Sequence, residues 1–204
     1  TFMQRGFNMP KKTFFFLIKE KQNRIIEAAI DEFSKNTFHK ASITNIIEQS
    51  EIASGSFYQY FENKGDLFKY IIEIVSKRKL KYIDQEVIQN PSKLSFFEFL
   101  RKVYKGGIEF AKENPKLVSI GNDLMNSNCE ICNEIKEELK PQSNQFFKTI
   151  LEKAIERGDV KEDIDPEFTA QFLTSINYSL SDLIYNEEGL SDNVMEVIEV
   201  LIGI

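Results

Sequence analysis

Apolar residues recur at intervals of three and four along almost the whole chain, which is the period of an amphipathic α-helix. One such stripe, within residues 19–35, contains Ile26, Ala29, Ile30 and Phe33. No segment shows the period-two alternation of a half-buried strand. The sequence therefore predicts an all-α protein of about nine to ten helices.

Turn and cap signals divide this helical pattern into a small three-helix head and a larger body. Ser42 precedes a short apolar stripe as an N-cap, Ser54 opens a second short helix, and a long helix starts at about Lys64. The predicted domains are residues 1–64 and residues 65–204. Further helices are expected over residues 96–112, 115–125, 130–157 (interrupted or kinked near Pro141), 166–185 and 192–201.

Charge, cysteine content and hydropathy limit the function classes. The net charge is -6, but residues 1–64 carry nine Lys/Arg and seven Asp/Glu, so a head of charge +2 precedes an acidic body. Nucleic-acid affinity follows the local basic surface, so this balance permits DNA binding by the head.

Two cysteines are too few for a disulfide framework and indicate a reducing, cytoplasmic location. No apolar run reaches the roughly 18 residues of a membrane helix, and the first residues do not form a secretion signal; a natural start at Met9 fits the sequence.

The stretch SGSFYQYFENK, residues 54–64, combines the signals of a core helix and of a polar surface. Two short helices joined by a tight turn are typical of a helix-turn-helix. We expect Ile52 to fill the turn, and Phe57 and Phe61 to anchor the second helix in the core. The residues left on the exposed face are Ser54, Gly55, Ser56, Tyr58, Gln59 and Tyr60.

These exposed groups suit a DNA groove. Serine and tyrosine hydroxyls donate to phosphate oxygens, Gly55 allows a close backbone approach, and Gln59 can contact a base edge. Lys64 adds a cation at the start of the long helix. The alternative is a core helix whose hydroxyls are incidental.

The run NRIIEAAIDEFSK…KASITNIIEQSEIASGSFYQYFENKGDLF, from Asn23 to Phe68, resembles the DNA-binding domain of the TetR/AcrR repressors. The matching elements are AAxxxF in the first helix, SIxxI in the second and GSFYxYFxxK across the third and fourth. The resemblance implies that Ser42 and Thr44 lie near phosphate or bases at the start of the second helix. It also implies that Ser54, Gly55 and Gln59 approach bases, and that Ser56, Tyr58, Tyr60 and Lys64 mainly contact the DNA backbone.

Three positions depart from the family pattern. Where the family usually has a small alanine, a glycine and a serine, this chain has Ile47, Glu51 and Ala53. A left-handed backbone at Glu51 would cost about 1 kcal/mol relative to glycine. We expect Ser54 to cap the second short helix in place of position 53. These departures concern the geometry of the turn rather than the groups that face DNA.

In the resembled family, the C-terminal domain encloses an inducer and dimerises through its last two long helices. The resemblance therefore implies that residues 142–157 and 166–185 form a four-helix bundle with a second copy; Asp165 and Pro166 are start signals for the latter helix. The expected interface residues are Phe168, Phe172, Ile176 and Leu180. The candidate ligand-lining residues are Tyr104, Phe110, Leu124, Met125, Phe146 and Tyr178. For both sets, simple core packing is the alternative.

Cys129 and Cys132 form a single CxxC pair. Two thiolates make an incomplete zinc site, so no metal site is predicted, and thiol-based sensing is a further alternative. The only histidine, His39, is expected at the surface or facing phosphate. No nucleophile–base–acid set and no phosphate loop is present, which argues against an enzyme, and no cofactor is predicted.

The sequence thus predicts a cytoplasmic transcriptional regulator. The simplest form is a repressor that binds a palindromic DNA operator as a homodimer and is released by a small hydrophobic ligand. Two other hypotheses are a DNA-bound adaptor or activator controlled by a protein partner, and a helical enzyme. No membrane partner is expected.

Overall fold

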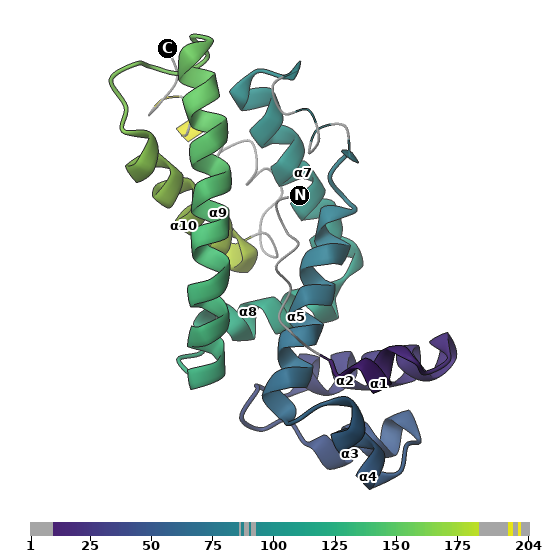
Figure 1. The fold of residues 1–204 in the computed structure, drawn as a ribbon. Helices are drawn as coiled ribbons and strands as arrows, with labels where there is room; N and C mark the ends of the chain where they lie inside the picture. Colours follow the sequence, from purple (N-terminus) through teal and green to yellow (C-terminus); the bar gives the residue numbers. More distant parts are fainter. Residues whose placement is uncertain are drawn as a thin grey trace. The chain divides into compact units, whose positions relative to one another are not determined.

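The computed structural model describes residues 10–85, 87, 90, 93–183, 196, 197 and 200, and only the backbone of residues 177–183. Within this part of the chain all regular secondary structure is helical, which confirms the predicted all-α fold (Figure 1). The predicted helix over residues 192–201 lies largely outside the described residues. The helices are α1 (Lys12–Phe15), α2 (Lys19–Lys35), α3 (Ile43–Ser50), α4 (Ser54–Tyr60), α5 (Lys64–Leu80), α7 (Phe96–Glu113), α8 (Pro115–Asn126), α9 (Glu130–Glu156) and α10 (Pro166–Leu183).

The described helices form two compact units. Of the described residues, the first unit contains 10–77 and 115–136, and the second contains 78–114 and those from 137 onward. The first unit is thus larger than the predicted head of residues 1–64. It is larger because α8, which follows the head by about fifty residues, packs against α2.

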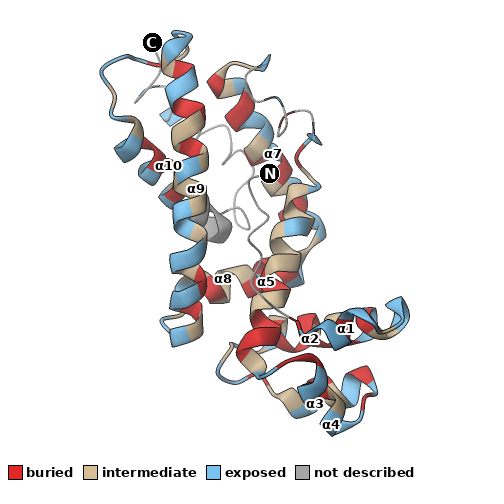
Figure 2. Ribbon diagram, in the orientation of Figure 1, coloured by how far each residue is buried: buried red, intermediate tan, exposed pale blue. Residues whose placement is uncertain are grey.

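In the first unit, α2 supplies a buried stripe and α3 packs against it. Ile25, Ala29 and Phe33 of α2 are buried, and the helix has the bounds that its apolar spacing predicts. Helix α3 begins at the predicted cap, because the Asn45 N–H donates to Ser42 Oγ at 3.3 Å. Buried and exposed residues both occur along these helices, red and pale blue in Figure 2.

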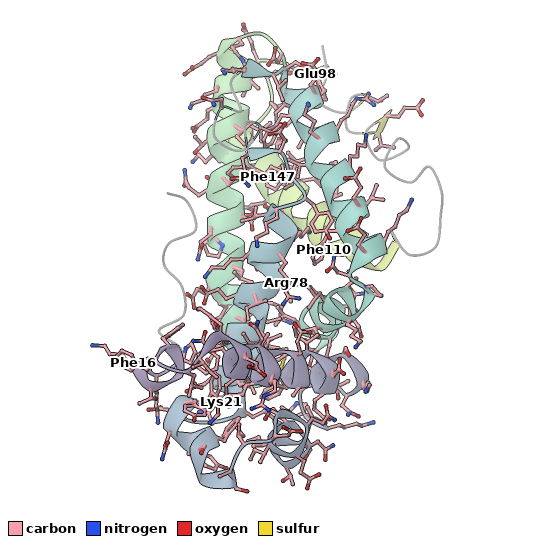
Figure 3. The ribbon with its side chains drawn as sticks, turned by 90° about the vertical axis from the view of Figure 1, so that its right-hand side faces the viewer. Phe16, Lys21, Arg78, Glu98, Phe110 and Phe147 are labelled. Atoms are coloured by element: carbon pink, nitrogen blue, oxygen red, sulfur yellow. A yellow bond between two sulfur atoms is a disulfide. The ribbon has the colours of Figure 1, made fainter. Side chains whose placement is uncertain are left out.

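The second unit has its own apolar core, built from α7, α9 and α10. Phe99 and Leu100 of α7, Phe147 and Leu151 of α9, and Leu173 of α10 are buried there; Phe147 lies among these helices in Figure 3. A wider set of half-buried apolar residues packs around this core.

Cap residues fix where two helices of the second unit start. Ser95 and Glu98 form a reciprocal capping box at the start of α7. Asp165 caps α10 as predicted, accepting the N–H groups of Glu167 at 2.8 Å and Phe168 at 3.3 Å. Helix α9 is not interrupted near Pro141, because it continues from Glu130 to Glu156 with the proline inside it.

No helix in the described part of the chain is both long enough and apolar enough to cross a membrane.

Candidate DNA-binding surface

Helix α4 presents a polar face over an aromatic base. Phe57 and Phe61 are fully buried and Ile52 is buried in the turn before them, as predicted. On the opposite face Tyr58 is 56% exposed and Gln59 is exposed. Among the other predicted DNA-facing residues, Thr44, Ser54 and Gly55 are exposed, and Ser42, Ser56 and Lys64 are half-buried.

The expected exposure of Tyr60 is wrong, because this side chain is buried. Its ring meets that of Phe14, in α1, with 6.2 Å between the ring centroids. The ammonium of Lys21 also lies 5.8 Å from the Tyr60 ring centroid. Tyr60 therefore belongs to the core that supports α4 rather than to the polar face.

Helix α1 also supports this surface and was not predicted from the sequence. It packs on α4 through Phe14, which is fully buried against Tyr60, Phe61 and Tyr70. Gln22 of α2 holds the end of α1 by donating to the carbonyls of residues 15 and 17. The apolar run FFFLI, residues 14–18, was the signal in the sequence for this helix, because its first residue, Phe14, is the buried anchor.

The segment that leads into α1 also completes the hydrogen bonding of α4. A helix end leaves its last carbonyls without partners, and a helix of seven residues is marginal by itself. Lys11 donates from its ammonium to the Tyr58 carbonyl at 3.1 Å and from its backbone N–H to the Tyr60 carbonyl at 2.9 Å. The Thr13 hydroxyl donates to the carbonyl of Gln59. The last three carbonyls of α4 are thus all bound by residues 11–13.

The turn between α3 and α4 contains a left-handed residue at Glu51, one of the positions that depart from the family pattern. Glu51 has φ 54° and ψ 43°, the conformation for which the family usually has glycine. Its carboxylate pairs with Arg24 of α2 at 2.7 Å, an exposed ion pair of small energetic weight.

The expected cap of α4 is wrong. Ser54 is already the first helical residue, and Ala53 occupies the N-cap without a side-chain hydrogen bond.

Lys64 holds the loop between α2 and α3. Its ammonium donates to the carbonyls of His39 at 3.2 Å and Ala41 at 2.9 Å, and it lies 4.8 Å from the ring centroid of Phe38. Burial lowers the pKa of Lys64, while the negative charge of Glu32 acts in the opposite direction. An ammonium has three N–H donors, so one remains beyond the two loop carbonyls. His39 itself is exposed.

The candidate ligand-lining residues do not gather in one compact unit. Tyr104 and Phe110 of α7 are buried in the second unit, where Phe146 of α9 is half-buried. Leu124 and Met125 of α8 belong to the first unit. The side chain of Tyr178 lies outside the described residues.

The stripe predicted for a dimer interface is partly exposed on α10. Phe168 is 69% exposed and Phe172 is 38% exposed, whereas Ile176 is half-buried against the core of the second unit. The side chain of Leu180 lies outside the described residues.

Cys129 and Cys132 are joined by a disulfide, although the sequence indicated a reducing location. The CxxC spacing places the two sulfurs one helical turn apart at the start of α9, within bonding reach. Cys129 Sγ also accepts the N–H of Cys132 at 3.2 Å. Among the described residues there is no cluster of three or more potential metal ligands.

A helix-turn-helix with an exposed polar second helix, attached to a helical body, defines a DNA-binding regulator. A model of the tetR family of bacterial regulatory proteins matches residues 25–71, and a tetracyclin repressor-like C-terminal domain matches residues 94–183. A TetR family transcriptional regulator from Chloroflexus aurantiacus is 30% identical, with a TM-score of 0.63 over 95% of this chain and 88% of its own. The chain belongs to the TetR family.

Two further similarities concern fatty acid regulators. The fatty acid metabolism regulator protein of Bacillus subtilis is 26% identical over 187 residues, 88% of this chain and 94% of its own. The structure of the transcriptional regulator FadR from Bacillus subtilis, in complex with stearoyl-CoA, shares the fold with a TM-score of 0.68 at 23% identity, covering 86% of this chain and 96% of its own. These relatives are regulators rather than enzymes.

Proposed function

We propose that the protein is a cytoplasmic repressor that binds a palindromic operator as a homodimer and releases it when a long-chain acyl compound binds. The observation that carries the DNA-binding half is the polar face of α4, which stands exposed over the buried Phe57 and Phe61. In this proposal α4 enters the major groove, and α3 lies across the backbone. The proposed DNA-contacting residues are Ser42, Thr44, Ser54, Gly55, Ser56, Tyr58, Gln59 and Lys64.

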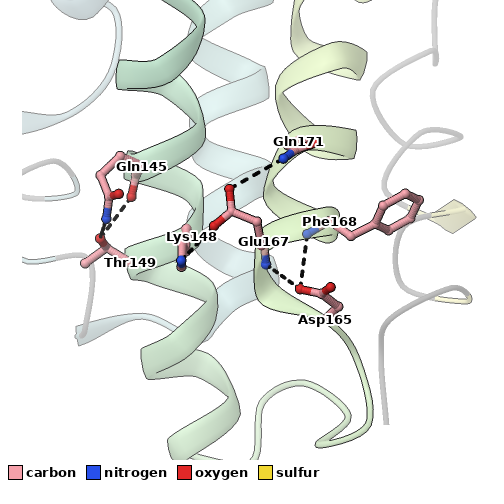
Figure 4. A network of polar contacts seen from close by, with 7 residues as sticks. All are labelled: Gln145, Lys148, Thr149, Asp165, Glu167, Phe168 and Gln171. Carbon is pink, nitrogen blue, oxygen red and sulfur yellow. Dashed lines mark hydrogen bonds and ion pairs between the residues drawn. The ribbon is translucent and has the colours of Figure 1, made fainter.

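The exposed phenylalanines of α10 support the dimer. A stripe of large apolar side chains on a surface is unfavourable in water and typical of an interface. The Phe168 ring projects away from the polar network that links α10 to α9 (Figure 4). In that network Lys148 pairs with Glu167 at 2.7 Å, so the neighbouring polar groups are bound within the chain. In the part of the chain that the structure describes, the exposed Phe168 and Phe172 are therefore the apolar groups that we propose a second copy to cover.

Polar atoms without partners in the second unit support a ligand. The hydroxyls of Tyr104 and Thr174 are buried without a hydrogen-bond partner, as is the Asn144 side-chain oxygen. A buried polar atom without a partner costs about 1–3 kcal/mol, and a bound molecule with a few polar atoms would remove that cost. The likeness to the Bacillus subtilis fatty acid metabolism regulator suggests the acyl class, and stearoyl-CoA is the first compound to test.

Tyr58→Ala and Lys64→Ala are expected to weaken operator binding about 10- to 100-fold. The measurement is a titration by fluorescence anisotropy on a duplex that the wild-type protein selects from a random-sequence pool. The salt dependence separates the two possible roles of Lys64. A lost phosphate contact reduces the slope of log affinity against log salt by about one, whereas a change in the α2–α3 loop alone leaves the slope unchanged.

Lys153→Ala is the matched control, because this exposed lysine lies on α9 in the second unit. Its affinity and salt slope should equal those of the wild type. If Tyr58→Ala and Lys64→Ala both bind as tightly as the wild type, the proposed DNA surface is wrong.

Tyr104→Phe is expected to raise the stability of the ligand-free protein by up to about 1 kcal/mol and to reduce the response to stearoyl-CoA. Burial raises the pKa of Tyr104 to about 12, which disfavours the phenolate further, and the neutral hydroxyl is available as a donor. The measurement is thermal unfolding with and without stearoyl-CoA, because a ligand that binds the folded state raises Tm.

Tyr82→Phe is the control with the opposite sign. The Tyr82 hydroxyl donates to Glu113 at 2.7 Å and accepts from Asn114 at 2.9 Å, so its removal should destabilise the protein. A Tyr104→Phe variant with an unchanged response to stearoyl-CoA would count against the ligand role of Tyr104. If the wild type itself shows no response, stearoyl-CoA is not the ligand, and the partner-controlled adaptor becomes the better hypothesis.

A further inference from the structure

The loop between α2 and α3, residues 36–42, is bound at its backbone by charged side chains from three different helices. Glu32 of α2 accepts the Ser42 N–H at 2.8 Å. Lys64 of α5 donates to the carbonyls of residues 39 and 41. Asp123 of α8 accepts the N–H of Phe38 at 2.9 Å. Two of these helices flank the helix-turn-helix in the sequence, but α8 lies far beyond it.

Helix α8 meets α2 and this loop along one polar edge. Lys116 pairs with Asp31, the Ser119 hydroxyl donates to the Ser34 carbonyl at 3.1 Å, and Asp123 binds the loop. Positions 116, 119 and 123 are three and four residues apart, so they share one face of the helix. The buried apolar side chains of α8 are Leu117, Val118, Ile120 and Leu124.

The polar contacts of α8 fix its orientation against the loop more closely than its apolar contacts can. Apolar burial is non-directional, whereas a hydrogen bond to a backbone N–H fixes a distance and an angle. Asp123 is the only one of the three whose partner is in the loop itself. That loop ends at Ser42, the residue that caps α3 and so sets where the first helix of the helix-turn-helix starts.

We infer that Asp123 is a positioning residue for DNA binding. It touches no DNA; it holds the Phe38 amide, and with Glu32 and Lys64 it fixes the loop that places α3 and, through the turn, α4. The inference rests on the proposed function, because it concerns the geometry of the same DNA surface. It also means that the DNA-reading unit is incomplete without a segment of the matched C-terminal domain.

The test compares Asp123→Ala with Asp123→Asn on the duplex that the wild type selects from a random-sequence pool. Asp123→Ala should bind about tenfold more weakly, the equivalent of one lost hydrogen bond, and Asp123→Asn should recover most of the affinity because its amide oxygen still accepts. The salt slope should not change in either variant, since no phosphate contact is lost. Exchange of the Phe38 amide hydrogen, measured without DNA, should be faster only in Asp123→Ala.

The direction of the change in DNA affinity distinguishes a positioning role of Asp123 from a simple effect of its negative charge. Removal of a carboxylate from a DNA-binding protein raises its affinity by electrostatics alone. Glu130→Ala, which removes an exposed carboxylate at the start of α9, is the control and should bind equally or more tightly. Asp123→Ala binding as tightly as the wild type, or Asp123→Asn binding as weakly as the alanine variant, would overturn the inference. Failure of the wild type to select any duplex would overturn the proposed function as well.

Discussion

Replacing Phe14 with alanine is expected to destabilise the first unit by about 3–5 kcal/mol, the usual cost of removing a fully buried phenylalanine ring. The ring of Phe14 lies 5.2 Å from that of Phe61 and 5.5 Å from that of Tyr70, measured between centroids. Its removal leaves a cavity beneath α1 and loosens the segment that binds the last carbonyls of α4. We therefore expect weaker DNA binding in addition to lower stability.

The neighbouring Phe16 provides a control of the same residue type on the same segment. Phe16 is 84% exposed and lies at the outer edge of the unit (Figure 3). Phe16→Ala should change the free energy of unfolding by no more than about 0.5 kcal/mol. Urea unfolding followed by circular dichroism gives both values. Equal effects of the two substitutions would show that α1 does not dock on α4 as described.

Introducing a charge at Phe168 is expected to abolish the dimer. Phe168→Glu replaces an exposed ring in the proposed interface by a carboxylate. In a two-fold symmetric contact the same change occurs on both copies, which adds like-charge repulsion and desolvation. Loss of a central aromatic anchor typically costs about 2–4 kcal/mol, or roughly 30- to 1,000-fold in the dissociation constant. Sedimentation velocity at a range of protein concentrations measures the shift from dimer to monomer.

Phe16→Glu is the matched control, since it introduces the same charge at another exposed phenylalanine, outside the proposed interface. It should leave the oligomeric state unchanged. A Phe168→Glu protein that remains as dimeric as the Phe16→Glu protein would place the dimer contact elsewhere. Because two half-sites multiply specificity, the monomeric variant should also lose most of its affinity for a palindromic duplex.

The features that could be predicted from the sequence are those that depend on residues close together in the chain. Helix α2 follows from its apolar spacing, and the starts of α3 and α10 follow from Ser42 and Asp165, because a cap acts within three residues of itself. Phe57 and Phe61 are one helical turn apart, so their common buried face could be predicted with the exposed face opposite. Most of the division of α4 into a buried and an exposed face could therefore be predicted from the sequence.

What the sequence missed depends on contacts between distant segments. Tyr60 looks like an exposed groove residue until Phe14, 46 positions earlier, covers it. Asp123 carries no motif, and its role follows only from its contact with an amide 85 positions away. The disulfide depends on the redox environment as well as on spacing, and spacing is all that a sequence provides.

The short helix α1 has a practical consequence for anyone who handles this protein. Since Lys11 and Thr13 bind the end of α4, their segment lies beside the surface proposed to read DNA. A fluorophore attached at or next to Lys11 would therefore lie close to that surface. An affinity measured with such an attachment would report on the attachment too, unless it is removed or used deliberately as a proximity probe.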